Sequence, residues 1–175
     1  MRKQSVLTIM CGLPRSGKST WLRNNKGYSI VVCPDVVRKE IFGHQWFASA
    51  EGFVWAFAES MVKLLLLQEK DVVVDATALT MGSRSRWINL GERHGAHIRI
   101  VWVKTPLEDV LERNRLSPKN EQIPEDKLKM MSAVFREPGE FEEEAGLEII
   151  IYQPRHRRHS NELLRKKEKG IQKTT

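Results

Sequence analysis

The 175 residues suffice for one domain with a hydrophobic core of ordinary size. Hydrophobic residues make up 41% of the chain and charged residues 29%, which is typical of a globular protein. No apolar run approaches the roughly 20 residues that cross a bilayer, and the apolar stretch near the N-terminus is too short for a signal peptide. We therefore predict a cytoplasmic protein with no membrane partner, in which Cys11 and Cys33 are buried free thiols.

The net charge of +7 lies mostly at the C-terminus. Residues 155–175 contain eight Lys and Arg residues and two Glu residues, whereas residues 1–154 are nearly neutral. We therefore divide the chain into a body, residues 1–154, and a basic tail, residues 155–175, that is partly helical or disordered. The tail is expected either to add non-specific attraction for nucleic acid or to be a solvated end.

Five short runs of mostly apolar residues predict strands over residues 6–11, 28–33, 71–76, 98–103 and 147–152. Their near-continuous apolar character is typical of strands that are buried on both faces of a parallel sheet. Segments with helical spacing separate them and cover residues 18–25, 36–42, 50–68, 83–94, 106–115 and 124–135. This alternation predicts an α/β sandwich with right-handed crossovers.

The longest predicted helix, residues 50–68, carries an apolar stripe that we expect to face the core. The stripe consists of Val54, Phe57, Met61 and Leu65.

Residues 12–19, Gly-Leu-Pro-Arg-Ser-Gly-Lys-Ser, match the phosphate-binding pattern G-x-x-x-x-G-K-[ST]. They lie between the first predicted strand and the first helix, the context that this motif requires. Glycines let backbone N–H groups converge on nucleotide phosphates, and the following helix N-terminus presents its positive dipole end. We expect Lys18 to neutralise phosphate charge and Ser19 to ligate Mg²⁺, so ATP and Mg²⁺ are the predicted cofactors. The expected ATP contacts in this segment are Gly12, Pro14, Arg15, Ser16, Gly17, Lys18, Ser19 and Thr20.

The motif predicts a P-loop NTPase sandwich with a five-stranded parallel sheet in the order 2-3-1-4-5. In such a sheet the P-loop follows the central strand, because nucleotides bind where the strand order reverses.

Three further side chains are expected near the phosphates. Asp75 ends the third predicted strand, where a carboxylate either holds Mg²⁺ through water or caps the next turn. Asp35 follows the second strand, and Arg38 lies three residues later on the same helix face. This pair either points into the cleft or consists of an ordinary helix acid and a surface arginine.

Together these residues resemble the 5'-hydroxyl polynucleotide kinase family of P-loop kinases, over a match that runs from Val6 to about Tyr152. The shared features begin with Gly17-Lys18-Ser19-Thr20-Trp21. The most specific ones are Asp35-x-x-Arg38 and Asp75-x-Thr77, and they are followed by Arg84, Arg86, Trp87 and Arg113-Asn114.

The resemblance implies ATP-dependent phosphoryl transfer to the 5'-hydroxyl end of DNA or RNA. In that family the acid matching Asp35 is the general base, and the arginine matching Arg38 contacts the acceptor's phosphate. The residues matching Lys18 and Ser19 bind the donor phosphates and the metal, and the acid matching Asp75 is required. Acceptor contacts are therefore expected from Asp35, Arg38, Thr77, Arg84 and Arg86.

The chain departs from the family where the lid arginine is expected, because Ser117 occupies that position. We expect a lid over residues 113–122 in which Arg113, Arg115 or Lys119 reaches the β- and γ-phosphates, unless Arg113 pairs with neighbouring glutamates instead. The phosphatase motif Asp-x-Asp-x-Thr does not occur in these residues, so we expect a kinase without a phosphatase domain.

Two other functions are compatible with the same motifs. A kinase for a small-molecule alcohol would use the same cradle and base, and its closed pocket would be lined by Trp46, Phe47 and Trp55. A nucleotide-gated nucleic-acid-binding module would bind through the tail and would need no base at position 35. The oligomeric state is left open.

Overall fold

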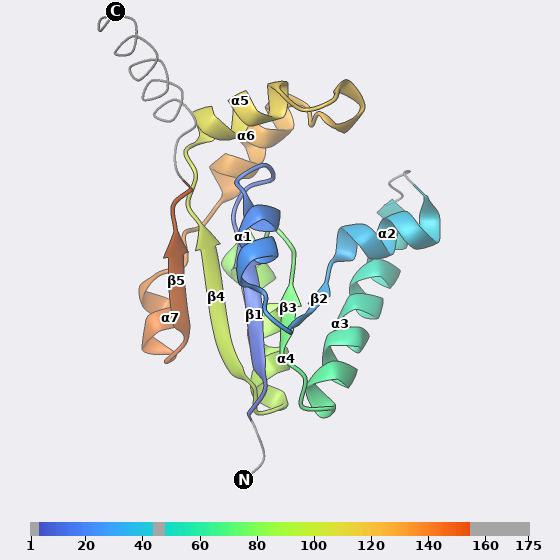
Figure 1. Cartoon of the computed structure of the whole chain (residues 1–175), viewed down its shortest axis with the longest axis vertical. Coiled ribbons are helices and arrows are strands. Elements are labelled where there is room, and N and C mark those ends of the chain that lie inside the picture. The colour runs from blue at the N-terminus through green and yellow to red at the C-terminus, as the bar shows by residue number, and fades with distance from the viewer. Residues whose placement is uncertain (1–3, 44–47, 155–175) are drawn as a thin grey trace, which may run out of the picture.

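The computed structural model describes residues 4–43 and 48–154. Five parallel strands form one sheet in the order β2-β3-β1-β4-β5 (Figure 1). The strands are β1 (Val6–Cys11), β2 (Ile30–Val32), β3 (Val72–Val74), β4 (His97–Val103) and β5 (Glu148–Tyr152). This order confirms the α/β sandwich and the strand arrangement predicted from the sequence.

Seven α-helices accompany the sheet in the described part of the chain. They are α1 (Lys18–Asn25), α2 (Pro34–Phe42), α3 (Glu51–Leu67), α4 (Met81–Arg93), α5 (Leu107–Arg115), α6 (Glu125–Val134) and α7 (Glu140–Glu144). Figure 1 shows α1 over one face of the sheet and α4 over the other, with α5 and α6 beyond the carboxyl ends of the strands. No helix in residues 4–43 or 48–154 is both long and apolar enough to cross a membrane.

The central strand β1 is buried on both faces, which explains its continuous apolar sequence. Leu7 and Ile9 face the cluster that contains Trp87 of α4. Met10 points to the opposite face and packs with Trp21 of α1. The P-loop that follows β1 is therefore carried by a strand that side chains fix from both sides.

The buried face of α3 differs from the predicted stripe. Phe57 is 41% exposed, and Met61 and Leu65 are only partly buried at the edge of the core. The helix is apolar on most of its surface, so spacing alone does not select one face, and small side chains permit the closest approach to the sheet. The fully buried residues are Val54, Ala58, Val62 and Leu66.

Several element ends also differ from the prediction, and side chains explain two of these differences. Strand β2 is shorter than expected because Tyr28 is exposed and Cys33 forms the N-cap of α2. Helix α4 begins earlier than expected because Thr80 and Ser83 form a reciprocal capping box. The predicted basic tail, residues 155–175, lies outside the described residues.

Two glycines of α4 form a matched pair for testing how tightly this helix packs. A methyl group at Gly91 would lie 3.0 Å from side-chain atoms of both Leu7 and Ile98, whereas a methyl group at Gly82 would meet no atom within 4 Å. We expect Gly82→Ala to raise the free energy of unfolding by up to about 1 kcal/mol through helix propensity. Gly91→Ala should lower it by about 1–3 kcal/mol through overpacking. Urea denaturation measures both, and equal stability of the two variants would contradict the prediction.

Candidate active site

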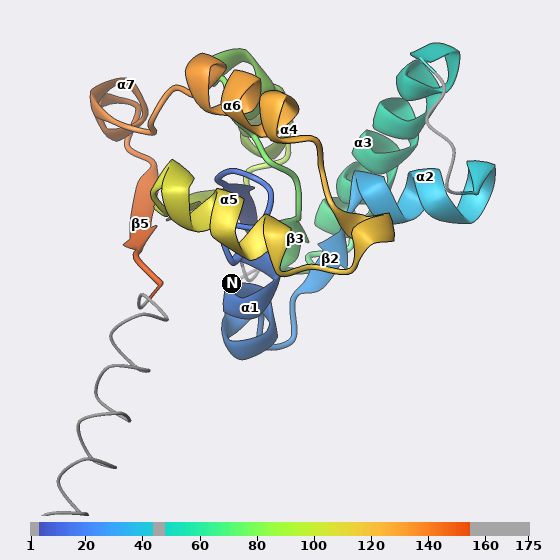
Figure 2. The ribbon, with the colours of Figure 1, turned by 90° about the horizontal axis from the view of Figure 1, so that it is seen from above.

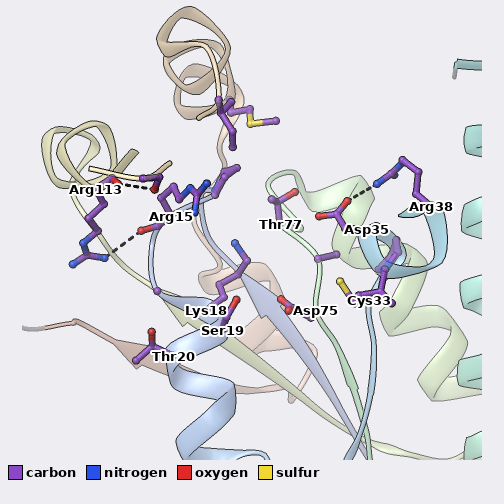
Figure 3. A pocket seen from close by; sticks show the side chains of 18 of the residues that line it. Arg15, Lys18, Ser19, Thr20, Cys33, Asp35, Arg38, Asp75, Thr77 and Arg113 are labelled. Carbon is purple, nitrogen blue, oxygen red and sulfur yellow. Dashed lines mark hydrogen bonds and ion pairs between the residues drawn. The ribbon is translucent and has the colours of Figure 1, made fainter. Parts of the chain in front are cut away.

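A cleft of about 1180 Å³ opens at the carboxyl ends of the strands. Its lining comes from the P-loop, the start of α2, the segment after β3 and the connection between α5 and α6 (Figure 3). The predicted site residues that line it are Pro14, Arg15, Gly17, Lys18, Ser19, Thr20, Asp35, Arg38, Asp75, Thr77 and Arg113. The structure thus brings together the motifs that follow β1, β2 and β3 in the sequence.

Gly12 starts the P-loop at a point where no side chain fits. Its φ angle is 143°, and a Cβ atom there would lie 2.8 Å from the carbonyl oxygen of Val103 in β4. Its N–H donates to the carbonyl of Thr77 at 3.0 Å. The loop is therefore held between the segment after β3 and the end of β4.

The carbonyl oxygen of Ser16 is held by two side chains that follow β4. Thr105 Oγ1 donates to it at 2.8 Å, and Arg113 Nη1 donates at 2.7 Å and also reaches the carbonyl of Arg15 at 3.3 Å. These bonds occupy carbonyl oxygens, which would otherwise repel an anion. Among the described residues, Ser16 Oγ is a buried side-chain atom with no hydrogen-bond partner.

Lys18 lies folded over the loop that precedes it. Its Nζ donates to the carbonyls of Gly12 and Leu13 at 3.0 and 2.9 Å. Burial lowers the pKa of Lys18, and the carboxylate of Asp75 opposes this shift. Negatively charged phosphates beside Nζ would favour its charged form in the same way, so the site suits an anion.

Asp75 follows β3 and faces Ser19 beneath Lys18 (Figure 3). Burial raises the pKa of Asp75, while Lys18 acts in the opposite direction. The hydroxyl and the carboxylate are the oxygen ligands that Mg²⁺ prefers. The described residues contain no group of three or more His, Cys, Asp or Glu side chains that could hold a metal, so phosphates and water would have to complete its coordination.

Asp35 and Arg38 lie together at the start of α2, as their spacing predicts. Arg38 donates from Nη1 to Asp35 and from Nε and Nη2 to Glu51 of α3, at 2.6 and 2.9 Å for the latter two bonds. These bonds raise the pKa of Arg38 above its ordinary value, with the Glu51 bond as the largest cause. The side chain of Asp35 is 85% exposed, so it remains accessible from the cleft.

Glu51 is a site residue that sequence reasoning missed. It lies 13 positions after Arg38 on another helix, and the intervening residues include 44–47, which fit no predicted element. Only the packing of α2 against α3 brings the two side chains together.

The structure contradicts the prediction that Arg84 contacts an acceptor. Its side chain is 1% exposed and forms an ion pair with Glu142 at 2.7 Å. It also donates to the carbonyls of Ala78 and Arg136 at 3.3 and 2.7 Å. Arg84 therefore joins α4 to α7 in the interior, and its donors are not available to a ligand.

Three other predicted cations, Arg86, Arg115 and Lys119, do not line the cleft. Arg86 pairs with Glu59 at 3.1 Å and lies over the ring of Trp55, 5.4 Å from its centroid. Arg115, predicted as a lid residue, pairs with Glu125 at 2.6 Å on the surface. Arg113, for which pairing with glutamates was the expected alternative, donates to the P-loop carbonyls of Arg15 and Ser16.

Trp55, Cys33 and Ser117 also line the cleft. Trp46 and Phe47 lie outside the described residues. Cys33 is half-buried beside Asp75, and burial raises the pKa of its thiol. Ser117, at the expected position of the lid arginine, lines the cleft and donates to the carbonyl of Arg113 at 3.0 Å.

A family model described as an AAA domain (AAA_33) matches residues 7–138. The chain belongs to this family. Its sheet order and P-loop give it a P-loop kinase-like fold, as the resemblance predicted.

Several solved structures share this fold. A chain of the Pnkp1/Rnl/Hen1 RNA repair complex is 22% identical with a TM-score of 0.68, over 77% of this chain and 45% of that chain. APS kinase CysC of Mycobacterium tuberculosis, solved with AMPPNP and APS, is 19% identical with a TM-score of 0.62, over 92% and 96%. A protein of Chloroflexus aurantiacus is 13% identical with a TM-score of 0.71 over both chains in full. The match thus spans less than half of the RNA repair chain.

Asp75→Asn tests whether the buried carboxylate reduces stability. Because burial raises the pKa of Asp75 in the folded state, its ionised form lowers the free energy of unfolding at neutral pH. We expect Asp75→Asn to melt at a higher temperature than the wild type at pH 7. The difference should disappear as the pH falls through the raised pKa toward 3.8, where the wild-type carboxyl is protonated. A lower melting temperature for the variant at pH 7 would refute this assignment.

Proposed function

We propose that the protein transfers the γ-phosphoryl group of ATP to the 5'-hydroxyl end of DNA or RNA. The observation that carries the proposal is that one cleft contains a P-loop with Lys18 and, across from it on α2, Asp35 beside Arg38. Similarity to a chain of an RNA repair complex agrees with this proposal at the level of the fold.

The donor side of the cleft would bind the phosphates of ATP. The P-loop backbone and the N-terminus of α1 surround the β- and γ-phosphates, and Lys18 neutralises their charge. Mg²⁺, bound by Ser19 and through water by Asp75, would supply additional positive charge between these phosphates. Thr105 and Arg113 hold the loop in shape through the Ser16 carbonyl.

The acceptor side would orient the hydroxyl. Asp35 accepts a hydrogen bond from the 5'-hydroxyl and takes its proton while the hydroxyl oxygen bonds to the γ-phosphorus and the bond to ADP breaks. An aspartate suffices, because a loose phosphoryl-transfer transition state needs orientation and late proton acceptance more than a strong base. Arg38 retains two N–H groups beyond its three bonds to Asp35 and Glu51, and these can donate to an acceptor phosphate.

The openness of the site supports a large acceptor. Asp35 is 85% exposed, and the cleft of about 1180 Å³ exceeds the roughly 300–1,000 Å³ of typical small-molecule sites. A small-alcohol kinase is the second candidate, favoured by Trp55 in the cleft wall. A module that only binds nucleic acid would give Asp35 no role.

The deciding experiment is transfer of labelled γ-phosphate to chosen acceptors. We expect label on a 5'-hydroxyl oligonucleotide and none on the same oligonucleotide that already carries a 5'-phosphate. Nucleosides and sugars, tested at equal concentration, should be poor acceptors. Efficient labelling of a small alcohol alone would support the second candidate, and no transfer to any acceptor would support the binding module.

Single substitutions should separate the two sides of the cleft. Asp35→Asn is expected to bind ATP normally and to lower transfer by about 10²–10⁴-fold, because it removes a positioned general base. Lys18→Ala should abolish transfer to every acceptor, because Lys18 acts on the donor. Arg38→Ala should raise KM for the oligonucleotide, whereas Arg86→Ala, outside the cleft, serves as the matched control and should not. Near-normal turnover by Asp35→Asn would show that the base is misassigned.

A further inference from the structure

Arg15 occupies a position in the P-loop that suits glycine. Its φ angle is +64°, in the left-handed region that residues other than Gly, Asn and Asp rarely adopt. Backbone strain of this kind persists where the surrounding structure requires the residue, and it concentrates at functional sites. This strain indicates that the Arg15 side chain has a role that glycine could not fill.

The guanidinium of Arg15 reaches a loop that is 106 positions away in the sequence. Its Nη2 donates to the carbonyl of Glu121 at 2.5 Å and lies 3.6 Å from the carboxylate of the same residue. Arg15 also lines the cleft beside Lys18. One side chain therefore connects the phosphate cradle to the segment between α5 and α6.

That segment, residues 116–122, is a loop whose two ends are held together by hydrogen bonds. The side chain of Asn114 exchanges two hydrogen bonds with the backbone of Ile123, at 2.7 and 2.9 Å. Gln122 Nε2 donates to the carbonyls of Arg115 and Ser117 at 3.0 and 2.8 Å. These bonds fix where the loop starts and ends, while its tip, the 3₁₀ turn Lys119–Glu121, is where Arg15 binds.

The loop lies at the cleft, where it could cover a bound nucleotide. Figure 2 looks down on the site and shows the connection leaving α5, passing toward β2 and α2, and returning to α6. Ser117 and Ile123, near its two ends, line the cleft. A segment in this place shields phosphoryl transfer from water when its tip is held down.

We propose that Arg15 is a positioning residue that couples occupancy of the P-loop to the covering loop, residues 116–122. Donor phosphates bound by the P-loop fix the backbone of Arg15, and its guanidinium then fixes the tip of the loop at Glu121. The inference depends on the proposed function only in that the cleft binds ATP. It does not depend on the acceptor.

Hydrogen exchange with AMPPNP tests the coupling without any acceptor. In the wild type, AMPPNP should slow amide exchange both in residues 12–19 and in residues 116–122. Arg15→Gly retains a residue suited to the left-handed backbone and removes only the guanidinium. We expect AMPPNP to protect its P-loop and to lose the protection of residues 116–122. Arg15→Lys should restore part of that protection, because an ammonium can still donate to the Glu121 carbonyl.

Glu121→Gln is the matched control, because it keeps the backbone carbonyl that accepts the 2.5 Å bond. Its loop should be protected as in the wild type. Equal protection of residues 116–122 in Arg15→Gly and the wild type would overturn the proposal. Failure of Arg15→Gly to bind AMPPNP would also overturn it, since Arg15 would then be a direct phosphate ligand.

A kinetic measurement provides a second readout. With a loop that no longer closes, Arg15→Gly should hydrolyse more ATP per phosphoryl group transferred than the wild type does, because water enters the site. An unchanged ratio would contradict the coupling. If the wild type transfers no phosphate to 5'-hydroxyl ends but shows the exchange coupling, the proposed function fails and this inference stands.

Discussion

The P-loop lies against the end of β4 with no side chain between them, and the geometry of the site depends on this contact. Gly12 approaches the carbonyl of Val103 so closely that a Cβ atom would lie 2.8 Å from it. The contact places Thr105 and Arg113, which follow β4, directly beneath the Ser16 carbonyl. The same stretch of backbone thus positions the loop and supplies the side chains that keep its carbonyls occupied. The Arg113 guanidinium thus holds the loop through its backbone carbonyls.

The close packing around the cleft disfavours the charged forms of two side chains, Lys18 and Asp75. Both side chains are partly buried, and burial disfavours the charged form of each. Each charge offsets part of the other's penalty, but both pKa shifts still follow burial. Bound phosphates with a divalent cation would give each group a charged partner. The unliganded fold therefore carries a cost that a nucleotide relieves, which is common where a site is built for a charged ligand.

Local sequence patterns predicted those features that depend on residues close together in the sequence. Continuous apolar runs identified all five strands, and the motif at residues 12–19 placed the cradle after the central one. The spacing of Asp35 and Arg38 put both on one turn of α2. Arg84 and Glu51 could not be predicted, because their partners lie 58 and 13 positions away and are reached only through packing. For the same reason the stripe predicted on α3, which is apolar on most sides, is only partly correct: Val54 is buried, whereas Phe57 is exposed.

The pairing of Arg38 bears on which end of a polynucleotide the site prefers. Two carboxylates, Asp35 and Glu51, surround one guanidinium, so the cluster carries net negative charge when all three are ionised. A terminal phosphate placed against the exposed Asp35 would meet like charge, whereas a hydroxyl there donates a hydrogen bond. The acceptor's next phosphate can still receive the two remaining N–H groups of Arg38, whose direction Glu51 fixes through its two bonds. Under the proposed function, orientation more than net attraction would select a hydroxyl end, and most of the affinity would come from contacts along the rest of the acceptor.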